Sequence, residues 1–280
     1  MTIDSDFPRF RALYEAILAA GCDALFERVL QPWMEQAREA VAQMELFRQP
    51  GRFDMRSEQF LLPNWNLYAL SRVNDLLLMP FQDDARGCWD GPRITLDQYG
   101  HFFTGIGFRT FNANRFSPFY HEIVAVEQSP DQDQPIAIEQ TLWPGLMLGD
   151  LLFSRSGVRI VAGSSHALKS VAEQSPLYFA YRRLHRRTVD LSQGWGSNSQ
   201  WRTLFRRDYV AGDRLIYNID GTTSLDATGP THLDEAGLTA AQRLELCRHR
   251  CFVVTDNNDP DLWPFADRYE EPGGDISLQQ

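Results

Sequence analysis

The chain is poor in lysine and in cysteine. Lys169 is its single lysine, so arginine carries nearly all of the positive charge. The four cysteines are too few and too scattered for a disulfide framework in a chain of 280 residues, which is typical of a reducing compartment. They are Cys22, Cys88, Cys247 and Cys251. We therefore expect free thiols.

Long apolar runs are also missing. The sequence has no uninterrupted apolar window of about 18 residues, which is the length that a membrane-spanning helix requires. Residues 1–6 lack the basic and apolar regions of a secretory signal peptide. We therefore predict a soluble, cytoplasmic protein without a membrane partner. An apolar content of 43% over 280 residues is sufficient for a large core, and we expect a single domain over residues 1–280.

Positive charge is in deficit overall, because the formal net charge is -10. A phosphate backbone requires a clustered positive field, so this charge argues against a nucleic-acid partner. The charges are nevertheless uneven. Residues 182–214 contain eight arginines and three aspartates, whereas residues 256–275 contain seven acids and one arginine. The basic segment and the acidic tail, about residues 256–280, either face each other or are separately solvated.

The N-terminal part, about residues 7–80, has the periodicity of helices. Apolar residues recur at a spacing of three to four through residues 7–48. Pro32 is expected to kink this stretch or to lie in the first turn of a separate segment. A further helix is predicted over residues 64–79, because Pro63 immediately precedes its apolar stripe.

The later part, about residues 100–255, has the alternation of strands. The predicted strands are residues 122–127, 136–143, 146–153, 158–161, 201–210 and 214–219. The first two strands are expected to form a hairpin around a polar turn, and the last two a hairpin that turns at residues 211–213.

Further helices are predicted between and after these strands. They cover residues 166–173 and 177–186, and a last helix covers residues 240–250 with a cap at Thr239. This order predicts an α+β fold, in which N-terminal helices pack on a mostly antiparallel sheet of hairpins, with a further helix near the C-terminus.

No segment matches a catalytic motif that is specific enough to define a reaction. Ser165 and His166 are neighbours, but they do not form a Gly-x-Ser-x-Gly elbow, and a helix cap is the better interpretation. Cys247 and Cys251 share a helix face, whereas His249 points about 200° away, so the three cannot bind one metal ion. We expect a helix end with buried thiols there.

Two histidines are candidate acid–base groups. Neighbouring strand residues point to opposite faces, so only one of His121 and Glu122 can face a site. A histidine on a half-apolar face is more often a hydrogen-bonded core group, and this alternative stays open for His121. His101 precedes a glycine-punctuated aromatic segment, residues 102–109, which permits close approach of a ligand. His101, His121 and a carboxylate such as Glu122 or Glu139 could supply the ligand set of a non-haem iron centre.

The densest mixture of binding chemistry lies in residues 194–209. Two glycines permit a tight turn, amides supply neutral hydrogen-bonding groups, and Arg202 can hold a carboxylate or phosphate with two parallel hydrogen bonds. In a strand, Arg202 and Arg206 would lie on one face about 13 Å apart, which suits an elongated anionic ligand. The alternative is a polar turn whose arginines pair with nearby aspartates. The predicted ligand-binding residues are Trp195, Asn198, Gln200, Trp201, Arg202 and Arg206.

These features favour a cytoplasmic protein that binds a small molecule bearing a carboxylate or phosphate, and an enzyme over a mere binding protein. The pocket is expected between the sheet and the N-terminal helices, with Phe103 and Phe108 in its lining. Two alternatives remain: a non-catalytic interaction or regulatory protein that uses its charged surfaces, and a metal-dependent enzyme of the non-haem iron type. A protein partner or a homo-oligomer is compatible with each. The sequence defines no substrate, reaction or cofactor.

Overall fold

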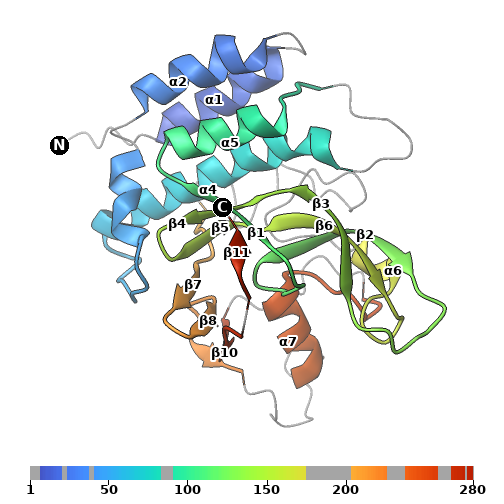
Figure 1. Cartoon of the computed structure of the whole chain (residues 1–280). Coiled ribbons are helices and arrows are strands. Elements are labelled where there is room, and N and C mark those ends of the chain that lie inside the picture. The colour runs from blue at the N-terminus through green and yellow to red at the C-terminus, as the bar shows by residue number, and fades with distance from the viewer. Residues whose placement is uncertain are drawn as a thin grey trace.

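A computed structural model confirms the α+β class. It describes residues 7–20, 24–37, 41–82, 91–174, 203–225, 237–257, 266–274 and 276–279. Within these ranges, helices from the N-terminal part pack on mostly antiparallel sheets, and a further helix lies near the C-terminus (Figure 1).

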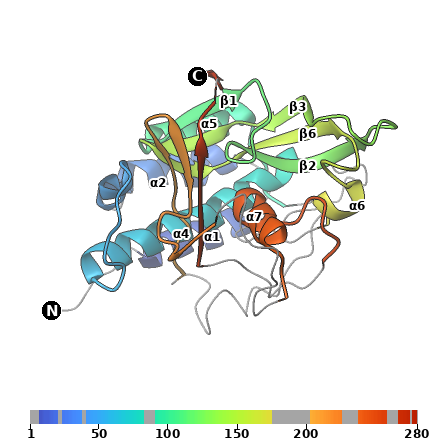
Figure 2. The same ribbon diagram turned by 90° about the horizontal axis from the view of Figure 1, so that it is seen from below.

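The helices lie on two sides of the sheets. In chain order they are α1 (Phe7–Ala19), the π-helix η1 (Phe26–Leu30), α2 (Gln31–Gln36), the 3-10 helix η2 (Gln43–Phe47), α4 (Glu58–Leu78), the 3-10 helix η3 (Met79–Phe81), α5 (Leu96–Gly105), α6 (Lys169–Ala172) and α7 (Ala240–His249). Helices α1, α2, α4 and α5 lie above the sheets in Figure 1, whereas α7 lies below the smaller sheet and beside β10 of the larger one. Figure 2, seen from below, shows α7 in front of α4 and α1.

The strands form two sheets. They are β1 (Arg109–Ala113), β2 (His121–Gln128), β3 (Ala137–Trp143), β4 (Gly145–Leu148), β5 (Leu151–Ser154), β6 (Ser156–Ala162), β7 (Asp208–Ala211), β8 (Arg214–Tyr217), β9 (Thr223–Ser224), β10 (Asp267–Pro272) and β11 (Leu278–Gln279). In the described part, the larger sheet has the order β11-β1-β4-β5-β7-β8-β10-β9 and the smaller one β2-β6-β3. Among the strands of the described ranges, the pairs β9–β10 and β2–β6 are parallel and the others antiparallel.

The helical predictions hold for most segments but not at every boundary. Pro32 lies in the first turn of the separate helix α2. This is the second of the two positions that were predicted for it. Helix α4 begins at Glu58 rather than at residue 64, so the predicted boundary at Pro63 is wrong. Proline removes one helical hydrogen bond, but Pro63 is itself buried, and its packing offsets that loss.

Helix α5 is absent from the predictions. Its N-terminus is a capping box, in which the Thr95 hydroxyl accepts from the Gln98 N–H at 3.1 Å and the Gln98 side chain accepts from the Thr95 N–H at 3.0 Å. The glycines of residues 102–109 were interpreted only as permitting close approach of a ligand, whereas the cap and the buried aromatic residues of α5 form a helix.

The hairpin predicted from residues 122–127 and 136–143 is wrong. Strands β2 and β3 each pair with β6, which lies between them. Alternation defines the two faces of a strand but not its partner. The most apolar of the three strands, β6, takes the central position, where it is covered on both faces.

Two other strands differ from their predicted bounds. Residues 146–153 form two strands, because the chain turns at Gly149, whose φ of 58° is in the left-handed region. The strand predicted over residues 201–210 begins only at Asp208. Just before it, the Phe205 N–H and carbonyl both bond to the Asn64 side chain of α4 instead of to a neighbouring strand. The hairpin β7–β8 and its turn are confirmed.

Part of the acidic tail joins the larger sheet. Strand β10 pairs with β8, and its Glu270 lies 3.0 Å from Arg214 of the basic segment. Asp267 is 2% exposed and forms an ion pair with Arg243 of α7. These contacts favour facing charges over a fully solvated tail. In the described residues, no helix is both long and apolar enough to cross a membrane.

Candidate binding cleft

His121, a predicted acid–base residue, lies in the protein interior. Its side chain is 1% exposed, and Phe116 stacks on its ring with centroids 5.6 Å apart. Nδ1 accepts a hydrogen bond from the Ser117 N–H at 3.0 Å, which leaves Nε2 to donate to the Ala113 carbonyl at 3.3 Å. Burial lowers the pKa of His121 to about 4, so the ring is neutral at physiological pH. These contacts favour the structural interpretation, and a catalytic role for His121 stays a prediction.

His101 lies on a different element. It projects from the exposed face of α5, where its ring meets the edge of Phe26 at 5.5 Å between centroids. Among the described residues, no three His, Cys, Asp or Glu side chains are close enough together to hold a metal ion. His101, His121 and Glu122 are all described, so they do not form the predicted metal set.

Most of the predicted binding loop cannot be compared with the structure. Trp195, Asn198, Gln200, Trp201 and Arg202 lie outside the described residues, and their roles stay predictions. Arg206 is described, but it is 7% exposed and bonds to Asp208 at 2.9 Å. Arg206 thus pairs with a nearby aspartate, which agrees with the alternative interpretation of this segment. The pair lies in the protein interior rather than on its surface.

The two phenylalanines expected in a pocket lining are core residues. Phe103 is fully buried and Phe108 is 4% exposed. Both pack against Phe153 of β5, with ring centroids 6.0 Å and 4.7 Å away. In the described residues, buried side chains therefore fill the interface between the N-terminal helices and the larger sheet.

Asp208 is the centre of a buried cluster of arginines. Its carboxylate is fully buried and accepts hydrogen bonds from Arg206 at 2.9 Å and Arg250 at 2.8 Å. Arg155 approaches it to 3.7 Å, and the Asn218 N–H donates to it at 2.7 Å. One carboxylate therefore joins β7, the end of β5 and the segment after α7.

The same arginines hold the C-terminal end of α7. Arg206 donates to the Cys247 carbonyl, and Arg155 donates to the Arg248 carbonyl at 2.7 Å. Carbonyls in the last turn of a helix have no partner within the helix, and the helix dipole favours cations beside them. The cluster thus fixes the position of α7.

The charges of this cluster set its protonation states. Burial by itself raises the pKa of Asp208, but Arg206, Arg250 and Arg155 together hold it well below its usual 3.8. Glu122 acts on Arg250 as a further negative group. The cluster therefore holds Asp208 ionised beside the C-terminal end of α7.

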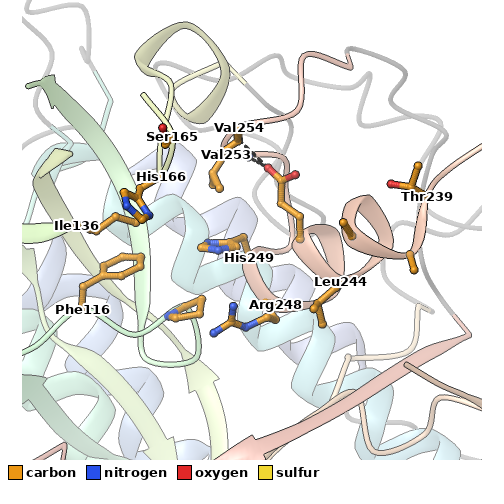
Figure 3. A pocket seen from close by; sticks show the side chains of 14 residues that line it. Phe116, Ile136, Ser165, His166, Thr239, Leu244, Arg248, His249, Val253 and Val254 are labelled. Atoms are coloured by element: carbon orange, nitrogen blue, oxygen red, sulfur yellow. Dashed lines mark hydrogen bonds between the residues drawn. The ribbon is translucent and has the colours of Figure 1, made fainter. Parts of the chain in front are cut away.

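A cleft of about 990 Å³ runs along the outer side of α7. The helix contributes one wall from its N-terminus at Thr239 to Arg248 and His249, and the opposite wall comes from segments that flank the strands of the smaller sheet. Figure 3 shows Phe116 and His166 gathered near His249. The remaining lining residues are Pro118, Ile136, Ser165, Ala240, Ala241, Leu244, Glu245, Val253 and Val254.

The only carboxylate among these lining residues, that of Glu245, accepts hydrogen bonds from other groups of the protein. Glu245 Oε1 accepts the backbone N–H groups of Val253, Val254 and Thr255, and its Oε2 accepts the Thr255 hydroxyl at 2.6 Å. This carboxylate closes the loop after α7 and has little capacity left for a ligand. The dashed lines in Figure 3 mark two of these bonds.

Cationic and imidazole groups remain at the other end of the cleft. The Arg248 side chain is 33% exposed and has five N–H donors, of which some engage Glu271, at 2.8 Å, and the Tyr217 side chain. His249 stacks on Phe116 with centroids 6.3 Å apart, and the exposed His166 lies 3.2 Å from the Asp133 carbonyl through Nε2. The cleft therefore combines apolar surface with groups that bind anions.

The thiols near the cleft are confirmed as buried. Cys247 is fully buried and Cys251 is 4% exposed. Burial raises the pKa of Cys247 to about 11, so this thiol is neither ionised nor nucleophilic at neutral pH.

Comparison with models of known protein families, with curated proteins and with solved structures finds no match to this chain. The function of this chain must therefore be inferred from the chemistry of its own cleft. Sequence reasoning considered His166 and His249 in two separate motifs and set both motifs aside. No local spacing could have joined them, because the two residues lie 83 positions apart in the sequence and line the same cleft only in the folded chain.

Proposed function

We propose that this protein binds a small molecule with a carboxylate or phosphate group in the cleft beside α7. The observation that carries the proposal is the chemistry of the lining: Arg248 and two histidines open into apolar surface, while Glu245 is internally satisfied. The volume, about 990 Å³, is in the range of small-molecule sites. The ligand's acidic group bonds to Arg248, and its apolar part contacts Phe116 and Leu244.

The buried arginine cluster supports this assignment. Arg155 bonds directly to the carbonyl of Arg248 and so fixes the backbone that carries the proposed anion-binding side chain. Whether the bound molecule is also transformed is a separate question, and enzymatic activity stays a hypothesis. His166 and His249 are the acid–base groups that the cleft offers to such chemistry.

The test compares two arginines that form matched ion pairs with neighbouring glutamates of β10. Arg248, beside the cleft, pairs with Glu271. Arg214, on β8 and outside the cleft lining, pairs with Glu270. Benzoate and phenyl phosphate serve as probes, with benzyl alcohol as the uncharged analogue, and calorimetry measures binding. Arg248→Gln removes charge-assisted hydrogen bonds, so affinity for both anions should fall about tenfold or more, whereas Arg214→Gln leaves it unchanged.

Three results would contradict the proposal. They are equal affinity of the Arg248→Gln variant, equal binding of benzyl alcohol, and absence of saturable binding of both anions at about 10 mM. Circular dichroism of both variants checks that the fold is retained.

A further inference from the structure

A second cleft, of about 740 Å³, lies between α5, β1 and the end of β3. Its lining contains His101, which is not part of the proposed anion site. The other polar lining residues are Asp97, Thr104, Thr110, Asn112 and Thr141, and the remaining ones are Leu96, Gly100, Leu142, Trp143 and Pro144. Both the place and the chemistry of this cleft differ from those of the cleft beside α7.

The polar side chains converge from three elements. Asp97 and His101 are four residues apart on α5 and therefore share one face of the helix. Thr110 and Asn112 are two residues apart on β1, so they point to the same side of the sheet. Thr141 belongs to β3. Together these side chains present carboxylate, imidazole, hydroxyl and amide groups to one space.

The charges of the lining disfavour an ionic ligand. No arginine or lysine lines this cleft among the described residues, so an anion has no cationic partner. Asp97 is the only acid in the lining, and it lies in the first turn of α5, where the positive end of the helix dipole already stabilises a carboxylate. A cation would therefore meet one carboxylate whose charge is largely offset. A neutral ligand with several donors and acceptors fits best.

Gly100 is a separate indication that something approaches this helix closely. Glycine is among the poorest helix formers, yet Gly100 lies in the middle of α5. Its backbone does not have a positive φ, and an added Cβ would meet only Thr110 Cγ2, at 3.9 Å. Neither backbone strain nor packing in the described residues requires glycine here. Glycine at this position therefore leaves the surface of the helix open to a ligand, and only a side chain larger than one methyl group would fill that space.

We infer that this cleft binds a neutral polyhydroxylated molecule of the monosaccharide class. Asp97 accepts from ligand hydroxyls, while Thr110 and Asn112 both donate and accept. Leu96 and Leu142 contact the C–H faces of the sugar ring, and the 42% exposure of Leu96 leaves its side chain accessible. The ring of His101, held edge-on by Phe26, completes the set.

The decisive variant fills the space beside the helix. Gly100→Leu places a side chain where the ring of the bound sugar would lie. Leucine is also a better helix former than glycine, so the thermal stability of the protein should not fall. Gly100→Ala is the matched control, because it also improves the helix but adds only one methyl group. Asp97→Asn removes the charged acceptor and retains the shape of the side chain.

Binding is followed through the imidazole NMR signals of His101, assigned with His101→Gln. Glucose, galactose and mannose are titrated separately, with methylammonium and phosphate as ionic controls. We expect a saturable shift with at least one sugar, an affinity lower by about tenfold or more in Gly100→Leu and Asp97→Asn, and near-normal binding in Gly100→Ala.

Several outcomes would overturn the inference. They are a lack of saturable shifts with all three sugars, shifts of equal size with an ionic control, and undiminished binding by Gly100→Leu. Arg248→Gln distinguishes this inference from the proposed anion site, because that variant should not alter sugar binding. Either proposal can therefore fail while the other stands.

Discussion

Replacement of Asp208 by asparagine should test how the cleft wall is held. Asp208 is fully buried and joins Arg206, Arg250 and Arg155 through one carboxylate. Asparagine has nearly the same shape but carries no charge, so the guanidinium groups lose their shared counter-ion in the interior. Its amide also presents N–H donors to arginine donors on one side.

The expected cost follows from the loss of a buried counter-ion. Removing one partner of a buried ion pair typically destabilises a protein by about 3–5 kcal/mol, because the remaining charge is uncompensated. For a chain of this size, such a loss corresponds to a decrease in Tm of about 10 °C. Asp213→Asn, at the exposed turn of the same hairpin, is the matched control and should change the free energy of unfolding by less than about 0.5 kcal/mol.

The effect should also depend on pH in one direction. The arginines hold the pKa of folded Asp208 well below the ordinary 3.8, so its contribution is complete above about pH 4 and is lost as the pH falls further. Urea unfolding of the wild type and the variant at several pH values measures this. A difference below about 1 kcal/mol at pH 7, or one that stays constant as the pH falls below 3.8, would refute the reasoning.

Two further predictions concern other buried groups. Folding lowers the pKa of His121 from 6.5 to about 4 and so favours its neutral form. The free energy of unfolding should therefore decrease by up to about 3 kcal/mol as the pH falls through this interval. In urea titrations His121→Gln should remove that slope, and an unchanged slope would argue against burial of the ring. Cys247, with its pKa raised to about 11, should resist iodoacetamide in the native protein at pH 8 and react after unfolding. Rapid native modification, detected by peptide mass spectrometry, would contradict this.

The local patterns of the sequence predicted the fold class and several elements. The repeat of apolar residues in α1 and the cap at Thr239 are local signals, and they required no knowledge of the rest of the chain. The burial of His121 also agreed with the more common interpretation of a histidine on a half-apolar face. By contrast, the glycine-punctuated residues 102–109 did not predict α5, whose cap lies before them at Thr95 and whose buried face is aromatic.

The partners of strands and charges required the tertiary structure. Alternation in residues 122–127 and 136–143 did not reveal that β6 separates the two strands. Arg206 was predicted to bind a ligand, because the residues next to an arginine in the sequence do not show whether its side chain contacts solvent or a buried carboxylate. Only folding brings Arg155, Arg206 and Arg250 to Asp208.

The sequence by itself determined composition, charge, helical periodicity and the absence of a specific catalytic motif, because these depend on neighbouring residues. The tertiary structure alone decided where the clefts lie. His166 and His249 line one cleft, and Asp97 and Thr141 line another, through contacts between segments that are distant in the chain. A binding site is a property of such long-range packing, which no local pattern in one sequence specifies.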